Sequence, residues 1–565
     1  MPSLNPDPMI SRRDFLRLMA ASLALAGIPG CTTRQPKENI LPYVNPPKGW
    51  VPGRPRYYAT TMETWGHAVG LLVKSDQGRP IKIEGNPLHP WSLGAADIFA
   101  QASLLTLYDP ARSATVLRQG LAGTWEACCA ELAAKREAWL ADGGKGLRIL
   151  IGSMTSPSAL AAIRSLLQTY PEAGLHVHDP LDSGHAISGA ALYAGAGAGS
   201  APVYRFANAR VIVSLDADFL GFGGGRTRYS RDFAEGRRAE SPQGMNRLYA
   251  AEGCPSLTGA MADRRLPIRP SEIPSLALLL AGALGMPEFA GLPESDAAAS
   301  GAGPEALAWT RSAAGDLSAQ RGRGLILAGE SQPAEVHALA LAMNVFLGNL
   351  GSTLDLFDPP HGVEALPART LPALTEDMAA GRVDTLLILD ANPAYTGPGD
   401  GDFPGALAKV PLSIHSGLYR DETASLCRWH VPAAHYLEAW GDGRARDGTL
   451  SLTQPMIEPL YGGKTRLEML AAMRGEFQAD AHALVRDYWR NRYRDRDIAG
   501  ADFAAPGGFP AFWERSLGEG VMAGSAETPK TPKTIPAAKG WSDVVRAGIS
   551  RVTQVPAVLE IAFRP

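Results

Sequence analysis

Short, continuously apolar runs alternate with stretches of helical periodicity through the middle of the sequence. Four of these runs read LRILIG at 147–152, ARVIVSLDADF at 209–219, GLILAG at 324–329 and DTLLILDANP at 384–393. Each run is short and lacks the apolar–polar alternation of a half-exposed strand, so each predicts a strand buried on both faces. Two further runs, GLHVHDP and PLSIHS, predict additional strands.

Helices are predicted between these strands. The Ser-Pro pair at 156–157 is typical of a helix start, and the helix should extend to about residue 169. Apolar residues recur on one stripe from about 333 to 347, which predicts a second helix. Such alternation indicates α/β units, in which helices cover both faces of a parallel sheet. We expect two of them, at about 140–225 and 300–425.

The region before the first unit has a different pattern. Residues 57–87 alternate apolar and polar positions on either side of a turn at 75–80, which predicts a meander of antiparallel strands. The predicted organisation has six parts: a signal at 1–31, a Pro-rich extended arm at 32–56, a β-rich and helical region at 57–140, a first α/β domain with inserted elements at 141–300, a second α/β domain at 301–475, and a helical or irregular tail at 476–565 that leads to a truncated strand.

Composition is that of an ordinary globular protein. The 565 residues are 45% hydrophobic and 20% charged, with a formal net charge of −3. That length is sufficient for several domains around a large core. No basic block stands out, and the balance is slightly acidic, which argues against nucleic-acid binding.

The first thirty residues predict export. SRRDFLRL places paired Arg12 and Arg13 before an apolar run at 18–28, which matches a twin-arginine signal. Cys31 follows in a lipobox-like position, although Ile28 and Pro29 depart from the commonest form. We expect lipidation of Cys31, with cleavage nearby and a free thiol as the alternative. The protein would then be anchored by acyl chains at the periplasmic face of the cytoplasmic membrane. The apolar segment at 273–286 is too short to span a bilayer and predicts a buried helix.

The cysteines argue against an iron–sulfur cluster. The chain has five, at 31, 128, 129, 254 and 427, and no two have C-x-x-C spacing. A cubane cluster requires about four thiolates, usually in closely spaced runs. Cys128 and Cys129 are adjacent in a predicted helix and are expected to be small apolar core residues. Cys254 is the one lone thiol between the predicted sheets; we expect neither metal binding there nor a disulfide with Cys427, although the sequence leaves both open.

Ligands of open parallel sheets bind beyond the carboxyl ends of the strands. The candidate loops are 152–156, 214–222, 329–332, 390–396 and 415–418. Backbone groups near Gly329, Glu330, Ser331 and Asn392 could face a phosphate-bearing cofactor, and the Gly-rich stretch at 221–231 adds basic side chains. These are Arg226, Arg228 and Arg231. None forms a specific phosphate-binding motif, so closure of turns is the expected role and a vestigial cleft the alternative.

His430, His435 and Glu438 form an H-x4-H-x2-E pattern that suggests a metal site. The spacing does not match ligand pairs on one helix face, and Pro432 interrupts the segment. We expect a structural role for all three residues, no metal site, and no catalytic residue in the chain.

Several longer motifs resemble the molybdopterin oxidoreductases. KIEGNPLHPWSLG and LYDPARS are similar to their N-terminal region, and ILDANPAYTGP with the HYLEAWGDGRARDG region is similar to their third domain. More narrowly, the twin-arginine signal with its nearby cysteine, CPSLTGAMADRRLPIRPSEI and HYLEAWGDGRARDG resemble the large iron–sulfur subunit of alternative complex III. In catalytic members a cluster cysteine often follows a glycine such as Gly94, but here Ala95, Ala96 and Asp97 follow.

The resemblance implies a fold and a role. The fold would be a molybdopterin-oxidoreductase-like α/β multidomain structure, with the C-terminal barrel and ferredoxin-like domains missing after VLEIAFRP. The role would be that of a non-catalytic scaffold in a quinol-oxidising membrane complex, with no cofactor in this chain. Implied partners are a multihaem cytochrome c, quinol-binding membrane subunits and a ferredoxin-like part that carries the iron–sulfur clusters. The alternative is an active subunit that binds a bis-pterin molybdenum cofactor and lacks a proximal cluster.

Overall fold

The computed structural model describes residues 51–552 except 52, 65, 181–183, 196–200, 241–243, 291–302, 358–361, 363–365, 499–502, 504–505 and 530–534, and also residues 13–14, 16–17, 49 and 560. The chain forms two compact units, residues 1–54 and 55–565. In the first unit, Arg13, Asp14, Leu16 and Arg17 are helical and exposed. The predicted signal residue Arg12 and the predicted anchor Cys31 lie outside the described residues, as does most of the Pro-rich arm.

The second unit begins with the predicted meander. Strands β1 (Arg56–Thr64), β2 (His67–Asp76) and β3 (Arg79–Gly85) pair antiparallel in the order β1-β2-β3. Helix α2 (Ile98–Leu107) follows, capped by the side chain of Asp97. The prediction of antiparallel strands in this region is confirmed.

The larger sheet has eight strands in the order β14-β7-β6-β15-β16-β17-β4-β5. From β14 to β17 the strands are parallel, and β4 and β5 close one edge antiparallel. Their bounds are β4 (Leu117–Arg118), β5 (Leu121–Ala122), β6 (Leu147–Ile151), β7 (Gly174–Val177), β14 (Ala368–Arg369), β15 (Thr385–Leu389), β16 (Leu412–Gly417) and β17 (Trp429–Pro432).

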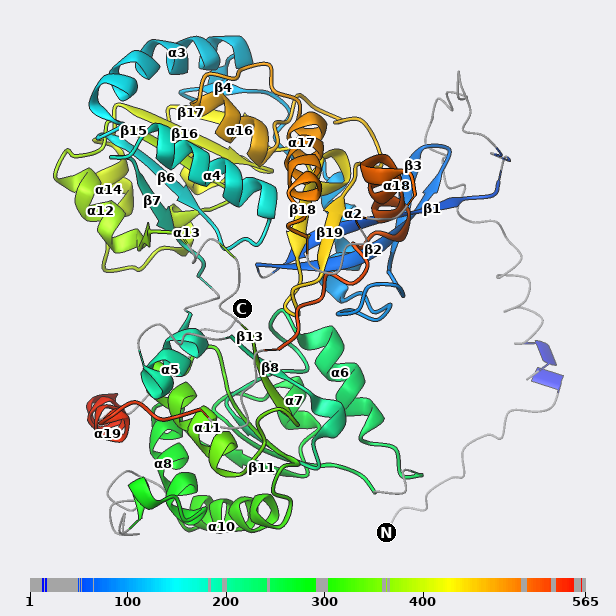
Figure 1. Cartoon of the computed structure of the whole chain (residues 1–565), viewed down its shortest axis with the longest axis vertical. Coiled ribbons are helices and arrows are strands. Elements are labelled where there is room, and N and C mark those ends of the chain that lie inside the picture. The colour runs from blue at the N-terminus through cyan, green and yellow to red at the C-terminus, as the bar shows by residue number, and fades with distance from the viewer. Residues whose placement is uncertain are drawn as a thin grey trace, which may run out of the picture. The chain divides into compact units, whose positions relative to one another are not determined.

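Helices cover both faces of this sheet, as the continuous apolar strands predict (Figure 1). On one face Leu147, Ile149 and Ile151 pack with helices α3 (Trp125–Asp142), α4 (Pro157–Thr169), α16 (Arg466–Met473) and α17 (Ala481–Arg494). On the other face Leu150 and Ile388 pack with α12 (Leu371–Ala379) and α14 (Phe403–Leu407). Successive residues of one strand therefore enter two separate cores, which requires apolar side chains at nearly every position.

The second sheet has four parallel strands in the order β11-β10-β9-β12. Their bounds are β9 (Val211–Leu215), β10 (Arg247–Glu252), β11 (Arg264–Pro267) and β12 (Gly324–Ala328). One face packs against α5 (His185–Ala194), α8 (Ile273–Ala283), α10 (Pro304–Ala319) and α11 (Ala334–Phe346). The opposite face packs against α6 (Arg226–Glu235) and a cluster of phenylalanines. The helix predicted at 273–286 is thus a buried core helix.

The sheets do not follow the predicted domain boundaries at 141–300 and 301–475. Strands β6 and β7 belong to the eight-stranded sheet together with β15, β16 and β17, whereas β9 to β12 form the other sheet. The chain therefore leaves the first sheet after β7, builds the second, and returns. The boundaries were wrong because parallel strands pair across long connections that local patterns do not record.

The remaining elements connect and cover these sheets. They are β8 (Ala201–Tyr204), β13 (Leu354–Phe357), β18 (Gly441–Arg444), β19 (Leu450–Thr453), α7 (Leu257–Ala260), α13 (Pro393–Thr396), α15 (Glu422–Leu426), α18 (Gly508–Glu519), α19 (Trp541–Val552), and short 3-10 turns at Phe206–Asn208, Pro270–Glu272, Pro287–Phe289 and Tyr436–Glu438. No sheet of the described residues closes into a barrel.

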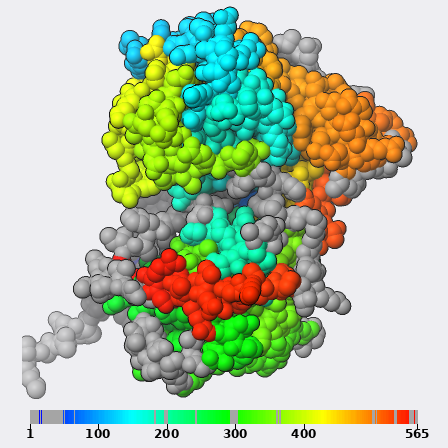
Figure 2. Space-filling model, turned by 60° about the vertical axis from the view of Figure 1, so that its left-hand side comes forward, coloured from blue at the N-terminus to red at the C-terminus, as the bar shows by residue number. Residues whose placement is uncertain are grey.

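The predicted C-terminal tail contains a well-packed helix. In α19, Trp541, Val545 and Ile549 recur every four residues and are buried in the core of the four-stranded sheet's helices. Figure 2 shows this helix, in red, lying against the green helical surface. Among the described helices, none combines the length and the apolar character that crossing a bilayer requires.

Candidate functional site

The central strands of the two sheets end in the same way. β9 is followed by Asp216 and β15 by Asp390, each between a leucine and an alanine. Both aspartates have a left-handed backbone, with φ of 62° and 51°. Such a conformation is uncommon for a residue other than glycine, and it persists only where the surroundings enforce it. Because ligands bind at this edge of open parallel sheets, the two strand ends define the candidate site.

Asp216 closes the loop that follows the neighbouring strand β12. Its Oδ2 accepts hydrogen bonds from Ser331 Oγ at 3.3 Å and from the buried Gln332 Nε2 at 3.1 Å. The backbone is equally close, since a Cβ on Gly329 would lie 2.1 Å from the carbonyl oxygen of Asp216. The structure therefore brings the candidates Gly329 and Ser331 together with Asp216, and a carboxyl group of the chain bonds to this loop.

An ion-pair network crosses the end of β15. Arg466, the first residue of α16, donates to Asp390 Oδ2 at 3.0 Å and to Glu63 Oε2 at 3.0 Å. Glu63 also accepts a hydrogen bond from the backbone N–H of Thr155, in the loop after β6. Burial opposes the charge of Arg466, but the carboxylates of Asp390 and Glu63 outweigh it and raise the pKa of the guanidinium. These charges tie the ends of β6 and β15 to β1 and α16.

Asp442 fills the N-terminus of α4, which follows β6. Its buried carboxyl accepts hydrogen bonds from Ser156 Oγ at 2.6 Å, from Ser158 Oγ at 2.9 Å and from Trp489 Nε1 at 2.8 Å, and the backbone N–H of Ser158 lies 3.2 Å away. Burial raises the pKa of Asp442, and these donors oppose that rise. Free N–H groups at a helix N-terminus are an anion site, so Asp442 occupies the place where a phosphate oxygen would bind.

Asn392, the candidate in the loop after β15, bonds to a neighbouring helix. Its Oδ1 accepts from the backbone N–H of Thr423 at 3.2 Å and from the Thr423 hydroxyl at 2.8 Å. Its Nδ2 donates to Glu422 Oε2 at 2.7 Å. The amide therefore holds this loop to the start of α15.

The arginines of the Gly-rich stretch bind the segment at 90–97 through an ion pair and hydrogen bonds. Arg226 is buried and pairs with Asp97, whose other oxygen caps α2. Its guanidinium also lies 4.5 Å from the ring centre of Phe99. Two more arginines of α6 donate to backbone carbonyls of the segment: Arg228 to Pro90 at 3.1 Å and Arg231 to Leu93 at 2.8 Å. The basic stretch thus holds the segment at 90–97 in place.

The cysteines do not converge. The four that the structure describes are all free thiols, so Cys254 and Cys427 form no disulfide. Burial raises the pKa of Cys128 and of Cys427 to about 12, and that of Cys129 to about 11. Protonated thiols are poor metal ligands. Within the described residues, no three His, Cys, Asp or Glu side chains are grouped so that they could hold a metal ion.

The H-x4-H-x2-E residues divide between two hydrogen-bond systems, because the backbone N–H of His435 donates to Glu438 Oε2 at 3.0 Å and His430 bonds elsewhere. His430 bonds to Ser113 and to His415. His435 bonds to Thr106, whereas Glu438 forms a buried two-point ion pair with an arginine. This arginine is Arg112, which donates to Glu438 Oε1 at 3.1 Å and Oε2 at 2.7 Å.

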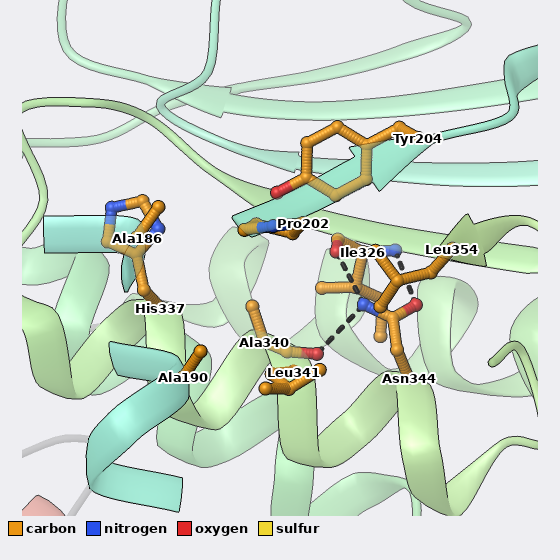
Figure 3. Close-up of a pocket in the computed structure, with 10 residues that line it drawn as sticks. All are labelled: Ala186, Ala190, Pro202, Tyr204, Ile326, His337, Ala340, Leu341, Asn344 and Leu354. Carbon is orange, nitrogen blue, oxygen red and sulfur yellow. Dashed lines mark hydrogen bonds between the residues drawn. The ribbon is translucent and has the colours of Figure 1, made fainter. Parts of the chain in front are cut away.

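Among the cavities of the described structure are a small one and a larger, open one. The first has a volume of about 20 Å³, which is room for about one water molecule. Figure 3 shows its wall, where Asn344 bonds to both backbone groups of Ile326 and to the carbonyl of Ala340, and so ties α11 to β12. His337 also lines it, and burial lowers the pKa of His337 to about 4. The second cavity, of about 590 Å³, is open and is lined by residues between Ala434 and Ala481.

The donor set fits a phosphate-bearing cofactor poorly. At the strand ends, hydrogen-bond donors that could hold phosphate oxygens already serve Asp216, Asp390 and Asp442. A phosphate brought to these positions would meet carboxyl groups of like charge. The candidate Arg226, which could offset that charge, is paired with Asp97.

Sequence reasoning did not single out the residues that fill the site. Asp216 and Asp390 lay inside candidate loops, and their shared Leu-Asp-Ala pattern after a predicted strand was a usable signal. Asp442, Arg466 and Glu63 had no such signal, because each arrives from a distant segment.

Comparison with known proteins agrees with this fold. No known family profile matches the chain. The chain is 26% identical over 475 residues to the menaquinone reductase, molybdopterin-binding-like subunit of Nitratidesulfovibrio vulgaris, an alignment that covers 76% of this chain and 67% of that protein. It superposes on acetylene hydratase from Pelobacter acetylenicus with a TM-score of 0.59 and 14% identity, over 76% of this chain and 71% of that one. The predicted molybdopterin-oxidoreductase-like α/β fold is confirmed.

Proposed function

We propose that the chain is a molybdopterin-oxidoreductase-like subunit of a membrane-bound, quinone-linked electron-transfer complex, and that it serves there as a scaffold. One observation supports the scaffold role: carboxyl groups of the chain itself occupy the space at the carboxyl ends of the parallel strands. Asp216, Asp390 and Asp442 bond to the loops and to the helix terminus at which a phosphate-bearing cofactor would be held. The quinone link rests on the likeness to the menaquinone reductase subunit.

The more specific proposal is a quinol-oxidising complex of the alternative complex III type. It rests on the sequence motifs, among them HYLEAWGDGRARDG and the twin-arginine pattern. The partners would be a multihaem cytochrome c, quinol-binding membrane subunits and a ferredoxin-like part that carries iron–sulfur clusters. We propose export by the twin-arginine route and a lipid anchor at Cys31, which place the protein at the periplasmic face of the membrane.

Metal content tests the scaffold role. We expect the purified, folded chain to contain neither molybdenum nor iron at a significant ratio, measured by elemental analysis of the native protein. Near-stoichiometric molybdenum, with a pterin released on denaturation, would instead establish the alternative function, an active bis-pterin oxidoreductase subunit without a proximal cluster.

Export and partnership need separate experiments. An Arg12→Lys, Arg13→Lys variant should remain in the cytoplasm as the unprocessed precursor, and normal export of that variant would refute the signal. Affinity purification from membranes should recover haem and iron–sulfur subunits. Recovery of the chain alone, under conditions that keep it membrane-bound through Cys31, would contradict membership of an electron-transfer complex.

A further inference from the structure

Four polar side chains form one continuous row across the carboxyl edge of the eight-stranded sheet. His415 on β16 and His430 on β17 are register partners on adjacent parallel strands, and both are buried. Ser113, from the segment after α2, lies at one end of the row. Asp421, the N-cap of α15, lies at the other. Nothing in the proposed scaffold role uses this row.

The contacts within the row are close. Ser113 Oγ lies 2.6 Å from His430 Nε2, and the two histidine Nδ1 atoms are 3.0 Å apart. His415 Nε2 lies 3.6 Å from Asp421 Oδ2. The imidazole planes differ by 23° and their centres are 5.2 Å apart. Because the centres are much farther apart than the 3.0 Å between the nitrogens, the rings meet end to end, and one Nδ1 must carry the proton that the other accepts.

The fold makes room for this arrangement. A Cβ on Gly417 would lie 2.7 Å from Cε1 of His415, so glycine at this position leaves space for the ring. At the other end, the backbone N–H of Ser113 donates to the carbonyl of Leu418 at 2.9 Å. That bond fixes the serine against the segment that follows β16.

The position of Asp421 selects one set of tautomers. A carboxylate facing His415 Nε2 favours a proton on that nitrogen, which leaves His415 Nδ1 as an acceptor. His430 must then carry its proton on Nδ1, and its Nε2 is free to accept the hydroxyl proton of Ser113. The hydrogen bonds therefore run in one direction, from Ser113 to His430 and from His430 to His415, whose Nε2 faces Asp421 at 3.6 Å, beyond hydrogen-bond distance. A nucleophile, a base and a group that orients the base are related in this way in serine-dependent acyl transfer.

In a second hydroxyl–histidine pair of the chain, the hydrogen bond runs in the opposite direction, from the histidine to the hydroxyl. Thr106 Oγ1 lies 3.0 Å from His435 Nε2, but His435 Nδ1 accepts the backbone N–H of Leu437 at 3.2 Å. The proton of His435 must therefore be on Nε2, where it donates to Thr106. The Thr106 hydroxyl in turn donates to the carbonyl of Ser103 at 2.7 Å. His435 cannot act as a base toward Thr106, which makes this pair a control within the same chain.

We propose that Ser113 is a nucleophilic serine, with His430 as its base, and that it becomes esterified by small, uncharged acyl or phosphonyl electrophiles. Ser113 is half-buried; the preceding Arg112 is buried but the following Ala114 is exposed, so a small reagent has an approach from that side. The adjoining charges are of both signs, with Arg420 and Asp421 near His430, and they favour no charged substrate. Burial, followed by the neighbouring His415, lowers the pKa of His430 to about 4, so at neutral pH the imidazole is an uncharged, weak base whose Nε2 can accept the hydrogen bond of Ser113.

The reaction needs no group beyond the electrophile and water. With an ester, Ser113 Oγ bonds to the carbonyl carbon while its proton moves to His430 Nε2, and that proton then leaves with the departing alcohol. Water attacks the acyl-serine by the reverse transfers and releases the acid. With a fluorophosphonate, the Oγ–P bond forms, the P–F bond breaks, and hydrogen fluoride is lost, so the serine stays labelled.

An alkyl fluorophosphonate probe tests the proposal on the full-length protein. We expect one label per chain, mapped to Ser113 by mass spectrometry of the wild-type digest, and a matching burst of nitrophenolate from p-nitrophenyl acetate. His430→Gln should slow labelling by at least about 10-fold, which is less than a base with a pKa near 7 contributes, because the pKa of His430 is lowered to about 4. Asp421→Asn should slow it less, and Thr106→Ala should leave it unchanged. Circular dichroism and the thermal midpoint establish that each variant is folded.

Several results would overturn the assignment. An unlabelled wild type would do so, as would label spread over exposed serines, or a rate unchanged in a folded His430→Gln variant. The mapped position in the wild type decides the question even if Ser113→Ala does not fold. None of these outcomes bears on the scaffold role, which depends on metal content and partners.

Discussion

The carboxyl of Asp442 accepts a 2.6 Å hydrogen bond from Ser156, the N-cap of α4. The carboxyl is fully enclosed, and its other donors are Ser158 and Trp489. A group of the chain thus completes the helix terminus that follows a parallel strand, a place where phosphate-binding proteins of this architecture hold their ligand. At the ends of β9 and β15, the carboxyl groups of Asp216 and Asp390 likewise accept hydrogen bonds from neighbouring side chains.

Removal of this carboxyl should be costly and should expose an anion site. Asp442→Ala leaves the donors of Ser156, Ser158 and Trp489 without a partner, and we expect a loss of about 3–4 kcal/mol in the free energy of unfolding. The matched control is Asp480→Ala, which removes an exposed helix cap and should cost about 1 kcal/mol. Inorganic phosphate should raise the thermal midpoint of Asp442→Ala more than that of the wild type. Equal shifts in both proteins would show that Asp442 does not occupy an anion site.

Gly329 should tolerate no side chain. A Cβ there would lie 2.1 Å from the backbone oxygen of Asp216, so Gly329→Ala must displace one of the two strand ends. We expect a cost of about 1–3 kcal/mol, measured by denaturant unfolding. Gly315→Ala is the control, because that glycine is exposed within α10 and a Cβ there meets nothing within 4 Å. The control should gain about 0.5–1 kcal/mol from its higher helix propensity. If Gly329→Ala left the free energy of unfolding unchanged, the two loops would be able to move apart without cost.

The network around Arg466 should be energetically significant. Arg466→Met leaves Asp390 and Glu63 without their shared cation, and we expect a loss of about 2–3 kcal/mol in unfolding free energy. That is less than the loss of a fully buried pair, because the Arg466 side chain is 26% exposed. The exposed pair of Arg490 and Asp487 supplies the control, and Arg490→Met should change stability by less than about 1 kcal/mol. Similar effects of the two substitutions would remove the case for a structural network at the strand ends.

The segment at 90–97 should depend on Arg226. This guanidinium makes a buried ion pair with Asp97, and lysine cannot reproduce its two-point geometry. We expect Arg226→Lys to increase hydrogen exchange at residues 90–97 while α11 keeps its protection. Arg238→Lys, in an exposed pair, is the control and should alter neither region. Unchanged exchange in Arg226→Lys would show that the segment is held by other contacts.

Much of the fold could be predicted because doubly buried strands have a plain signature. LRILI at β6 and TLLIL at β15 consist almost wholly of apolar residues, since successive side chains enter different cores. The order of the strands could not be predicted in the same way. Leu147 pairs with Thr385, and no local pattern connects residues so far apart in the chain.

The candidate site was predictable in position but not in chemistry. The loops after the strands follow from the topology of any open parallel sheet. What fills them depends on Asp442, Glu63 and Arg466, which reach the site from β18, β1 and α16. His415 and His430 become partners only when β16 and β17 take adjacent places in register. The spacing of His430, His435 and Glu438 gave no sign of this pairing, and of these three only His435 and Glu438 bond to each other.

The two imidazoles should make stability depend on pH. Burial lowers the pKa of His415 and of His430 to about 4, from an ordinary value near 6.5 in the unfolded chain. Below pH 6.5 the two histidines become protonated in the unfolded chain, whereas in the folded chain they stay neutral until the pH approaches 4. The stabilisation is therefore complete above about pH 6.5 and is lost as the pH falls toward 4. For each histidine, the difference between a pKa of 6.5 in the unfolded chain and about 4 in the folded chain corresponds to about 3 kcal/mol of unfolding free energy.

A variant isolates this pair from the other buried histidines. His415→Asn, His430→Gln removes both titrating groups, whereas the remaining histidines contribute equally to the variant and to the wild type. The charged groups that face the pair, Asp390, Arg420 and Asp421, also stay in place. We expect the unfolding free energy of the variant to fall by about 5 kcal/mol less than that of the wild type between pH 7 and pH 4.5, about half of it from each imidazole. Parallel curves would mean that the imidazoles titrate alike in both states, and that the end-to-end contact between His415 and His430 contributes nothing to the folded protein.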